Sequence, residues 1–312
     1  MSSVAKPQPT YKNIALVGGS GNLAAHIIEA FKQAGSEFNV TILTRHESID
    51  KARKAIEGYS QFDIKGVDYT DKHSIVQALV GQEVAISLLA YAAFAYQPTI
   101  IEAAIEADVK WFIPSEFGVD VERHPNKTLP MFAQKLRARE LLESQSKLAY
   151  TYILVGEFAD VFVLPLFGID FEKRTVNIPG KGTVPITFTS QSDIGKYTVA
   201  VLRRLPQFKN KSVLFGSFIA SYDDWIAEIE QATGAKFTVI HEPLEELESR
   251  VSSYIRDKST AYQLHAISDQ IRFANGSGTV LLGPDINTYD SASFNEVVPE
   301  TLHEVATRVI PK

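Results

Sequence analysis

The first 155 residues alternate short apolar runs with amphipathic stretches, and this alternation constrains the fold more than any other feature of the chain. Strands are predicted at 13–17, 39–43, 62–67, 84–89, 110–113 and 149–155. Helices are predicted between them, among others at 74–79, 98–107 and 129–136. Strands that are apolar along almost their whole length are typical of a parallel sheet covered by helices on both faces. The pattern therefore predicts an α/β fold built on a doubly wound parallel sheet.

The alternation of apolar runs and amphipathic stretches ends after residue 156. The segment 161–168 is apolar and contains a proline, and 175–188 places glycines and prolines among β-branched residues, which favours a hairpin or an irregular loop. Helices are predicted to return at 194–203, 222–231 and 244–255, and again near the C-terminus. We therefore expect two parts, a sheet domain at 1–155 and a smaller C-terminal α/β lobe at 156–312. Parts of the second half could return to the sheet.

Composition and charge narrow the classes of partner. The chain has 312 residues and a formal net charge of −6, which disfavours nucleic acid or an anionic membrane as the main partner. It contains no cysteine, so thiol nucleophiles, disulfides and cysteine-bound zinc are excluded. No spacing of His, Asp or Glu suggests a bound metal. No apolar leader and no run of 18 apolar residues is present, so we expect a cytoplasmic protein.

A glycine-rich loop follows the first predicted strand. The chain reads Gly18, Gly19, Ser20, Gly21, Asn22, Leu23, Ala24 between this strand and an amphipathic stretch. Gly18 permits a tight turn, Gly21 lets a pyrophosphate approach the backbone, and Ala24 keeps helix and strand close. The alternative is a purely structural glycine turn. Because the loop lies between strand and helix near the start of an α/β chain, we expect Gly18 through Leu23 to bind a dinucleotide on a Rossmann-type domain.

The end of the second strand should select the cofactor. An acidic residue there would bind the 2′-hydroxyl of NAD, but the chain continues Thr44-Arg45. A guanidinium can pair with a 2′-phosphate and stack on adenine, so NADP(H) is the expected cofactor. Glu47 could still fill the NAD role, and Arg45 could be a solvated loop residue. Asp68, after the third strand, is a weaker candidate for an adenine contact, or else a helix cap.

Several further motifs resemble one family. The glycine loop and Arg45 are followed in order by Gln97, Phe112-Ile113-Pro114-Ser115-Glu116-Phe117-Gly118, Lys135 with Glu143, Phe158, and Asp193-Ile194-Gly195. This order resembles the isoflavone reductase-like branch of the atypical short-chain dehydrogenase/reductases, which includes phenylcoumaran benzylic ether reductases, pinoresinol–lariciresinol reductases and NmrA-like proteins. The resemblance covers nearly the whole chain. It implies an NADP-binding domain at 1–155 and a substrate-binding lobe at 156–312.

The resemblance also implies a catalytic residue. In reductases of this family a lysine on the helix before the sixth strand is the general acid–base, and Lys135 matches that position. A free lysine titrates near ~10.4, so it must lose water or face another cation to work near neutral pH. Arg139, one turn further on, is expected to supply part of that effect. The alternative is a surface lysine whose stem covers apolar neighbours.

Other candidates lie at the ends of the predicted strands, where open α/β sheets place their ligands. Ser115 and Glu116 could form the floor of the cleft, or belong to a structural turn between Pro114 and Gly118. Phe158 is expected near the nicotinamide by resemblance. The remaining expected cofactor contacts are Ser87, Leu88, Gln97, Phe117 and Lys135 itself.

An apolar substrate pocket is the last expectation. Aromatic residues cluster after the fourth and sixth strands, which suits a flat aromatic ligand, although they could equally form core between the lobes. His124 could be a second acid–base or a solvated loop residue, and Glu157 a polar group of the pocket or a solvent-facing side chain. Gly156 departs from the plant reductases, which usually have a polar residue there. The expected substrate-binding residues are Tyr91, Phe94, Tyr96, His124, Glu157, Phe162 and Phe167.

Three functions stay open from the sequence. The first is an NADPH-dependent reductase of an aromatic or polycyclic small molecule, with Lys135 handling the proton. The second is an NmrA-like redox-sensing regulator that binds NADP without turnover, which the retained lysine disfavours. The third is a non-redox cyclase or condensing enzyme on the same fold. The expected partner is a small-molecule substrate, and monomer and homodimer are both compatible with the resemblance.

Overall fold

The computed structural model describes residues 9–257, 260–285, 287 and 289–311. The chain forms two compact units, and each unit is assembled from three separate segments. Unit 1 comprises the chain up to Phe117 together with Arg137–Ile153 and Ile194–Val213. Unit 2 comprises Gly118–Leu136, Leu154–Asp193 and the chain from Leu214 onward. The expected division of function at residues 155 and 156 stays a prediction, but the compact units themselves are interleaved along the chain.

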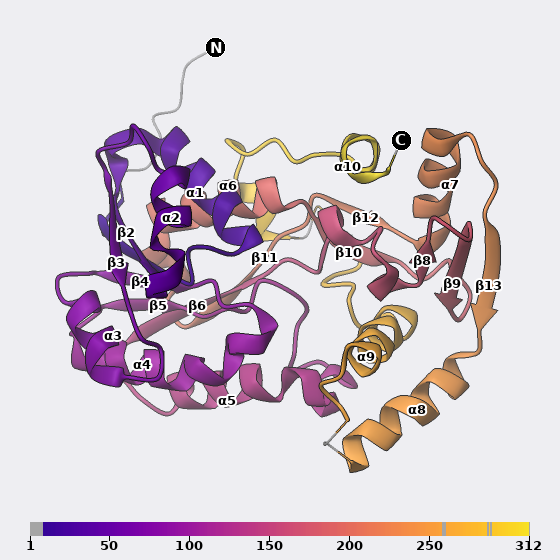
Figure 1. The fold of residues 1–312 in the computed structure, drawn as a ribbon, viewed down its shortest axis with the longest axis horizontal. Helices are drawn as coiled ribbons and strands as arrows, with labels where there is room; N and C mark the ends of the chain where they lie inside the picture. The colour runs from indigo at the N-terminus through magenta and orange to yellow at the C-terminus, as the bar shows by residue number, and fades with distance from the viewer. Residues whose placement is uncertain (1–8, 258–259, 286, 288, 312) are drawn as a thin grey trace. The chain divides into compact units, whose positions relative to one another are not determined.

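Unit 1 is built on a seven-stranded sheet in the order β11-β6-β5-β4-β1-β2-β3 (Figure 1). The strands are β1 (Asn13–Val17), β2 (Asn39–Thr44), β3 (Phe62–Gly66), β4 (Val84–Ser87), β5 (Trp111–Ile113), β6 (Ala149–Leu154) and β11 (Lys211–Leu214). The pairs from β3 through β6 are all parallel. All six strands expected in the first half are present, and the predicted doubly wound fold is confirmed.

The central strands are buried on both faces, as their composition requires. Ile14, Leu16, Ile42 and Ile86 are fully buried. Helices cover both faces, with α3 (Lys72–Leu79), α4 (Gln97–Glu106) and α5 (Ala133–Glu143) on one side in Figure 1 and α1 (Asn22–Ala34) and α6 (Gln191–Arg203) on the other. The helix α6 can approach α1 closely because Gly195 has no side chain, and a Cβ there would lie 2.5 Å from the carbonyl oxygen of His26.

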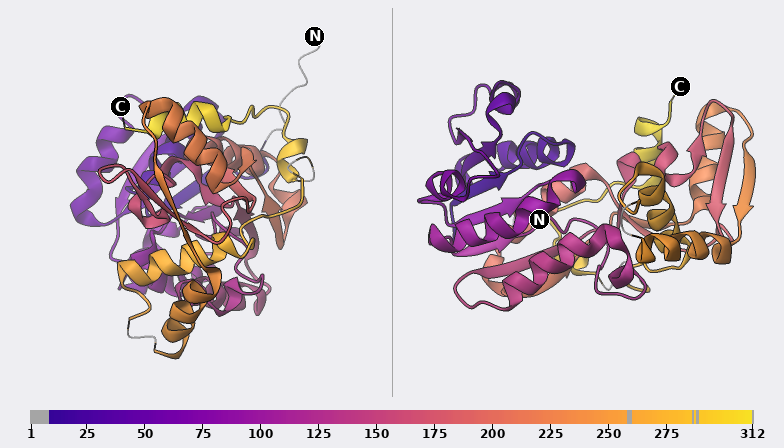
Figure 2. Two further views of the ribbon diagram at one scale, coloured as in Figure 1. Left: turned by 90° about the vertical axis from the view of Figure 1, so that its right-hand side faces the viewer. Right: turned by 60° about the horizontal axis from the view of Figure 1, so that its bottom comes forward.

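Unit 2 contains two three-stranded sheets. One has the order β12-β10-β7, formed by Phe218–Ala220, Ile186–Thr189 and Glu157–Phe158. The other has the order β13-β9-β8, formed by Thr238–Glu242, Thr175–Pro179 and Ile169–Asp170. Figure 2 shows β9 and β13 running side by side. The hairpin considered for 175–188 is therefore wrong, because β9 and β10 join different sheets.

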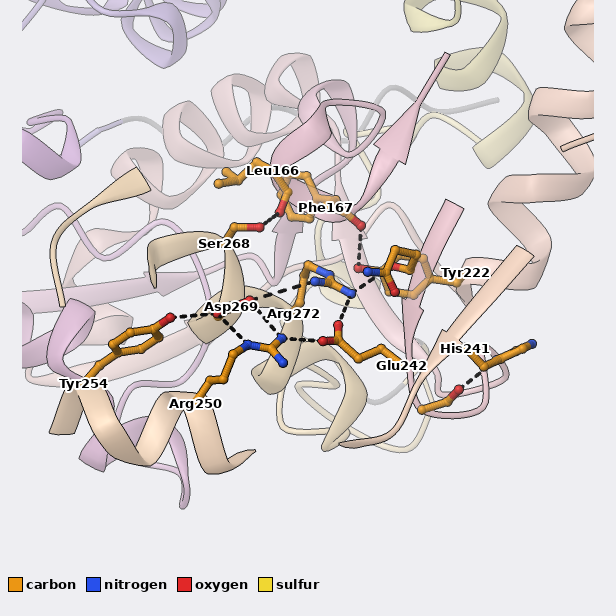
Figure 3. Close-up of polar contacts among 12 residues, drawn as sticks. Leu166, Phe167, Tyr222, His241, Glu242, Arg250, Tyr254, Ser268, Asp269 and Arg272 are labelled. Atoms are coloured by element: carbon orange, nitrogen blue, oxygen red, sulfur yellow. Dashed lines mark hydrogen bonds and ion pairs between the residues drawn. The ribbon is translucent and has the colours of Figure 1, made fainter. Parts of the chain in front are cut away.

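Unit 2 also contains the helices α7 (Tyr222–Thr233), α8 (Leu244–Arg256), α9 (Leu264–Gly276) and α10 (Leu302–Val309). A network of charges joins α8, α9 and β13 (Figure 3). Arg250 contacts both Glu242 and Asp269, and Arg272 donates to Glu242 at 2.5 Å. Tyr254 donates to Asp269 at 2.9 Å. These contacts hold the two helices against the end of the small sheet.

The core of unit 2 is aromatic. The ring of Phe162 lies 4.7 Å from that of Phe188, 4.8 Å from Phe167, 4.9 Å from Tyr222 and 5.4 Å from Trp225. These rings are tilted or edge-on to that of Phe162, as aromatic pairs prefer. Phe162, Phe188 and Trp225 are fully buried. The apolar segment 161–168 thus supplies the centre of this core.

Candidate functional site

A cleft of about 760 Å³ opens in unit 1 at the carboxyl ends of the parallel strands. It lies beside β1 and β4, where the strand order reverses, which is where doubly wound sheets bind ligands. The cleft is lined by Gly18, Ser20, Gly21, Thr44, Arg45, His46, Glu47, Val67, Asp68, Tyr69, Thr70, Leu88, Leu89, Ala90, Ala92, Ala93 and Tyr96. The glycine loop and the residue expected to choose the cofactor therefore share one cleft.

The glycine loop has the backbone approaches that the sequence predicts. Gly18 has a φ of +91°, and a Cβ there would lie 3.1 Å from the carbonyl oxygen of Leu88. At Gly19 a Cβ would lie 2.4 Å from a methyl carbon of Ile42. Gly21 precedes α1 and, having no side chain, leaves the first amides of the helix uncapped. An anion is the expected partner of such a helix start, and Asn22 and Leu23 form its first turn.

Tyr69 braces the loop, a role that the sequence analysis missed. Its hydroxyl donates to the carbonyl of Leu43 at 2.9 Å and accepts from the amide of Gly18 at 3.0 Å. Burial raises the pKa of Tyr69 to about 12, against the opposing effects of its hydrogen bond with Gly18 and of Arg45. Its ring stacks on Tyr96, with the centroids 6.2 Å apart. Tyr69 follows the third strand, and this position at the carboxyl edge of the sheet could have predicted that it lies near the glycine loop.

The cationic end of the cleft is exposed. The Arg45 guanidinium lies 3.3 Å from the Glu47 carboxylate, and both side chains are about two-thirds exposed, at 64% and 65%. Such a pair is weak and can reopen for a ligand. Lys51 donates to the backbone carbonyl of Ser20 at 2.8 Å, which brings a second cation to the loop. Thr44 donates to the Ser20 hydroxyl at 3.3 Å.

Asp68 lines the cleft but does not cap a helix. Its carboxylate accepts from the backbone amide and the hydroxyl of Thr70, at 2.8 and 2.7 Å, and these hydrogen bonds lower the pKa of Asp68. The N-cap of α3 is instead Asp71, which accepts from the amide of His73. The interpretation of Asp68 as a helix cap is therefore wrong. Its contact with adenine stays a prediction.

Polar side chains hold the backbone behind the cleft wall. Gln97 accepts from the amide of Ser115 at 2.7 Å, and the Ser115 hydroxyl donates to the carbonyl of Leu89 at 2.8 Å. Ser87 and Phe117 are buried, at 0% and 6% exposure. These hydrogen bonds of Gln97 and Ser115 stabilise the turns that follow β4 and β5. Contact of Ser87, Gln97, Ser115 and Phe117 with a cofactor stays a prediction.

Glu116 forms a buried ion pair that the sequence did not predict. Its carboxylate lies 2.8 Å from the guanidinium of Arg139, and the two side chains are 0% and 4% exposed. Arg139 also lies over the ring of Tyr152, 4.5 Å from its centroid. Arg139 was expected to lower the proton affinity of Lys135 by its positive charge. That effect stays a prediction, and the carboxylate of Glu116 beside the guanidinium opposes it.

Unit 2 holds Lys135 and Glu157. Lys135 lies in the first turn of α5 and is 7% exposed, so it is not a free surface lysine. Glu157 lies in β7 and is half-buried. Burial raises the pKa of Glu157 to about 7, and the Lys135 ammonium and the Asn275 amide oppose that rise. Phe158 is half-buried in the same strand, and His124 is exposed in a loop.

The expected aromatic substrate residues have two different surroundings. Tyr91, Phe94 and Tyr96 lie in a short 3-10 helix of unit 1 with partly accessible rings, and Tyr96 lines the cleft. Phe162 and Phe167 belong to the core of unit 2, at 0% and 2% exposure. The structure therefore gives Phe162 and Phe167 a packing role, while their contact with a substrate stays a prediction.

Two further searches concern metals and membranes. No group of three or more His, Asp or Glu side chains within the described ranges is arranged to hold a metal ion. No helix in the described part of the chain has the length and apolar character needed to cross a bilayer.

Known proteins resemble this chain in sequence and in fold. Oxidoreductase aprR of Aspergillus flavus is 30% identical over 237 residues, which are 75% of this chain and 78% of that protein. Phenylcoumaran benzylic ether reductase Pyrc5 of Pyrus communis is 32% identical over 248 residues, covering 75% and 79% of the two chains. The structure of AtPrR2 with NADP+ and (+)pinoresinol superposes with a TM-score of 0.78 at 20% identity, over 96% of this chain and 99% of that one.

A second solved structure, leucoanthocyanidin reductase with NADPH from Vitis vinifera, has a TM-score of 0.78 at 21% identity and covers 96% and 99% of the two chains. At these identities the structural likenesses show the fold. The family itself is shown by the sequence, because the NmrA-like family matches residues 10–272, which is most of the chain. The resemblance expected from the motifs is confirmed, and this chain belongs to the NmrA-like family.

Proposed function

We propose that the protein is an NADPH-dependent reductase of an aromatic or polycyclic small molecule. The observation that carries the proposal is the cleft of unit 1, which joins an uncapped helix start behind Gly21 to the exposed Arg45. Relatives named as an oxidoreductase and as a phenylcoumaran benzylic ether reductase support the reaction class. A cytoplasmic location and a monomeric or homodimeric state are part of the same proposal.

The residues of the cleft fit NADP(H). The loop backbone lies open at Gly21, where the nearest atom to an added Cβ is 3.9 Å away, so a pyrophosphate can reach the amides of α1. Arg45 can exchange the weak pair with Glu47 for a 2′-phosphate, and Lys51 offers a second charge beside the loop. Tyr96 and the alanines after β4 provide an apolar wall.

The chemistry then divides between cofactor and protein. NADPH, when bound, would supply the hydride for an electrophilic carbon of the substrate and would be oxidised to NADP+. Lys135 exchanges the accompanying proton at its Nζ, so the substrate gains two hydrogens in all. The low exposure of Lys135 excludes bulk water from this proton. The substrate class rests on the relatives, since one is named for a benzylic ether and one solved neighbour contains pinoresinol.

Calorimetric titration with NADPH and NADH tests the cofactor, using the wild type, Arg45→Ala and Lys135→Ala. We expect NADPH to bind more tightly than NADH, and Arg45→Ala to weaken NADPH alone by about 1–3 kcal/mol, the value of a charge-assisted contact. Lys135→Ala should keep the binding. Absence of binding by either nucleotide would refute the proposal.

Turnover is tested with a panel of aromatic enones, quinone methides and benzylic ethers, followed by NADPH absorbance and product mass. A gain of two hydrogens supports the reductase. An unchanged composition with turnover would instead support a cyclase or condensing enzyme, in which the cofactor is structural. Binding without turnover, together with an NADP-dependent protein partner, would support the regulator.

A further inference from the structure

We propose that Glu47 is a specificity-determining residue of the cleft in unit 1. Its carboxylate competes with the 2′-phosphate of NADP(H) for Arg45, and so it limits the preference of this protein for NADP(H) over NAD(H). The inference deepens the proposed function and rests on it for the identity of the ligand. It concerns binding alone, so it can be tested without any substrate.

The turn that carries Glu47 is fastened on both sides. It is the short 3-10 helix that directly follows Arg45 at the end of β2. The amide of Ser48 donates to the carbonyl of Arg45 at 2.9 Å and closes the turn. The ring of His46 lies against the backbone of Gly66, where an added Cβ would be 2.4 Å from the Nδ1 atom of His46. The backbone of this turn therefore holds Glu47 at the wall of the cleft.

Glu47 engages the cation that a 2′-phosphate needs. Its carboxylate oxygen Oε1 lies 3.3 Å from the Nε atom of Arg45. Both side chains are largely exposed, and both residues line the cleft. Arginine binds a phosphate through a pair of adjacent N–H donors, and Nε–H is one of the donors in such a pair. In this structure part of the donor set of Arg45 is therefore taken by Glu47.

The second carboxylate of the cleft wall has other partners. Asp68 accepts from the backbone amide of Thr70 at 2.8 Å and from the Thr70 hydroxyl at 2.7 Å. These two hydrogen bonds fasten the Asp68 side chain to its own loop, after β3. Among the described residues that line the cleft, Glu47 is thus the acidic side chain that is paired with Arg45.

The two cofactors differ at the 2′ position, so they meet this pair differently. The 2′-phosphate of NADP(H) is strongly anionic near neutral pH and must displace Glu47 from Arg45. The displaced carboxylate stays on the same turn as Arg45, where it repels the phosphate. The 2′-hydroxyl of NAD(H) is neutral and can donate to a carboxylate, which leaves the pair intact. Glu47 therefore weakens the binding of NADP(H) selectively, while Arg45 and Lys51 still attract the phosphate.

Calorimetric titration of NADPH and NADH into the wild type and Glu47→Gln measures this effect. Glutamine keeps the shape of the side chain and removes its charge, and the exposure of the site makes a folding defect small. All titrations use one ionic strength, because salt screens exposed charges. We expect the ratio of the NADH to the NADPH dissociation constant to rise about three- to tenfold in Glu47→Gln, since both the competing pair and the repulsion are lost. The change should lie mainly in a tighter complex with NADPH.

Asp50→Asn is the matched control, because it removes the same charge from the same part of the chain. The carboxylate of Asp50 pairs with Arg53 at 3.3 Å, and Asp50 is outside the set of described residues that line the cleft. Its effect on the ratio should stay below about twofold, since exposed charges away from the ligand are screened. If Asp50→Asn moved the ratio as far as Glu47→Gln, the effect would be one of net charge and the inference would be overturned. An unchanged ratio in Glu47→Gln overturns it as well.

The Arg45→Ala background separates competition from repulsion. No guanidinium remains there for Glu47 to engage, so adding Glu47→Gln should improve NADPH binding by less than it does in the wild type. A gain of the same size in both backgrounds would show that the carboxylate acts on the phosphate by itself, which overturns the competition for Arg45.

The inference and the proposed function fail in different ways. If neither nucleotide bound to the wild type, both would be refuted. If both nucleotides bound and were turned over but Glu47→Gln left the ratio unchanged, only the inference would be overturned. A shifted ratio without turnover of any substrate in the panel would support the inference and refute the reductase.

Discussion

Replacing Gly156 with alanine should destabilise unit 2 far more than the same change at Gly180. The two glycines have nearly the same backbone conformation, with φ values of +68° and +73°. They differ in what surrounds them. An added Cβ at Gly156 would lie 2.2 Å from the carbonyl oxygen of Thr187, whereas nothing lies within 4 Å of one at Gly180. Gly180→Ala is therefore a matched control for the cost of conformation alone.

The magnitude follows from three contributions. An alanine at positive φ costs about 1–2 kcal/mol at either position. A stiffer unfolded chain returns about 0.4–1 kcal/mol at both. At position 156 the clash adds about 1–3 kcal/mol. Thr187 cannot move away easily, because its hydroxyl is 2.6 Å from that of Tyr289 and its strand pairs with β12. We expect a loss of about 1–4.5 kcal/mol for Gly156→Ala. For Gly180→Ala we expect a loss of about 0–1.5 kcal/mol.

Urea unfolding checks these values, with stability taken from the midpoint and slope of the transition. The chain has two tryptophans, Trp111 in unit 1 and Trp225 in unit 2, and both are buried. In a Trp111→Phe background the remaining fluorescence comes from Trp225 and reports the unfolding of unit 2 alone. If Gly156→Ala lost no more stability than Gly180→Ala, the close approach of the backbone at Gly156 would be refuted.

Three further changes test other contacts. Arg139→Ala removes the cation beside the buried Glu116 and should cost about 3–5 kcal/mol in urea unfolding; a loss below about 1 kcal/mol would contradict the buried pair. Tyr69→Phe removes two hydrogen bonds, one to Leu43 and one from the amide of Gly18, and should lower stability by about 1–3 kcal/mol in thermal unfolding, with no change as the contrary result. For Glu157, burial puts the pKa at about 7 in the folded chain against 4.5 unfolded, so ionisation lowers wild-type stability as the pH rises between these values. Glu157→Gln should escape this loss and gain about 2–3 kcal/mol relative to the wild type from pH 4.5 to 7, and parallel pH profiles would count against it.

The sheet of unit 1 was largely predictable because its first six strands are continuous apolar runs. The seventh strand, β11, was not, since only two of its four residues are apolar and its first two are exposed at the edge. Helix α9 was missed for a related reason. Its buried face includes Gln270, Arg272 and Asn275, and these polar residues hide the helical period of apolar side chains.

The parts of the candidate site that are formed by short stretches of sequence were predictable. The glycine loop and Arg45 line one cleft, as their spacing along the first two strands suggested. Contacts between distant segments were not predictable. The pairing of Glu116 with Arg139 joins residues 23 positions apart, and it places a carboxylate beside the guanidinium that was expected to act on Lys135.

The interleaving of the two units has a consequence for synthesis on the ribosome. The sheet of unit 1 gains its last strand only at Leu214, about a hundred residues after β5 ends at Ile113. At about 5–20 residues per second, roughly 5–20 s separate the emergence of these two strands. During that time the growing sheet has an open edge, first at β5 and then at β6. A nascent chain stalled near residue 155 would thus expose an unfinished sheet edge, which is a site where chaperones or a second chain can pair.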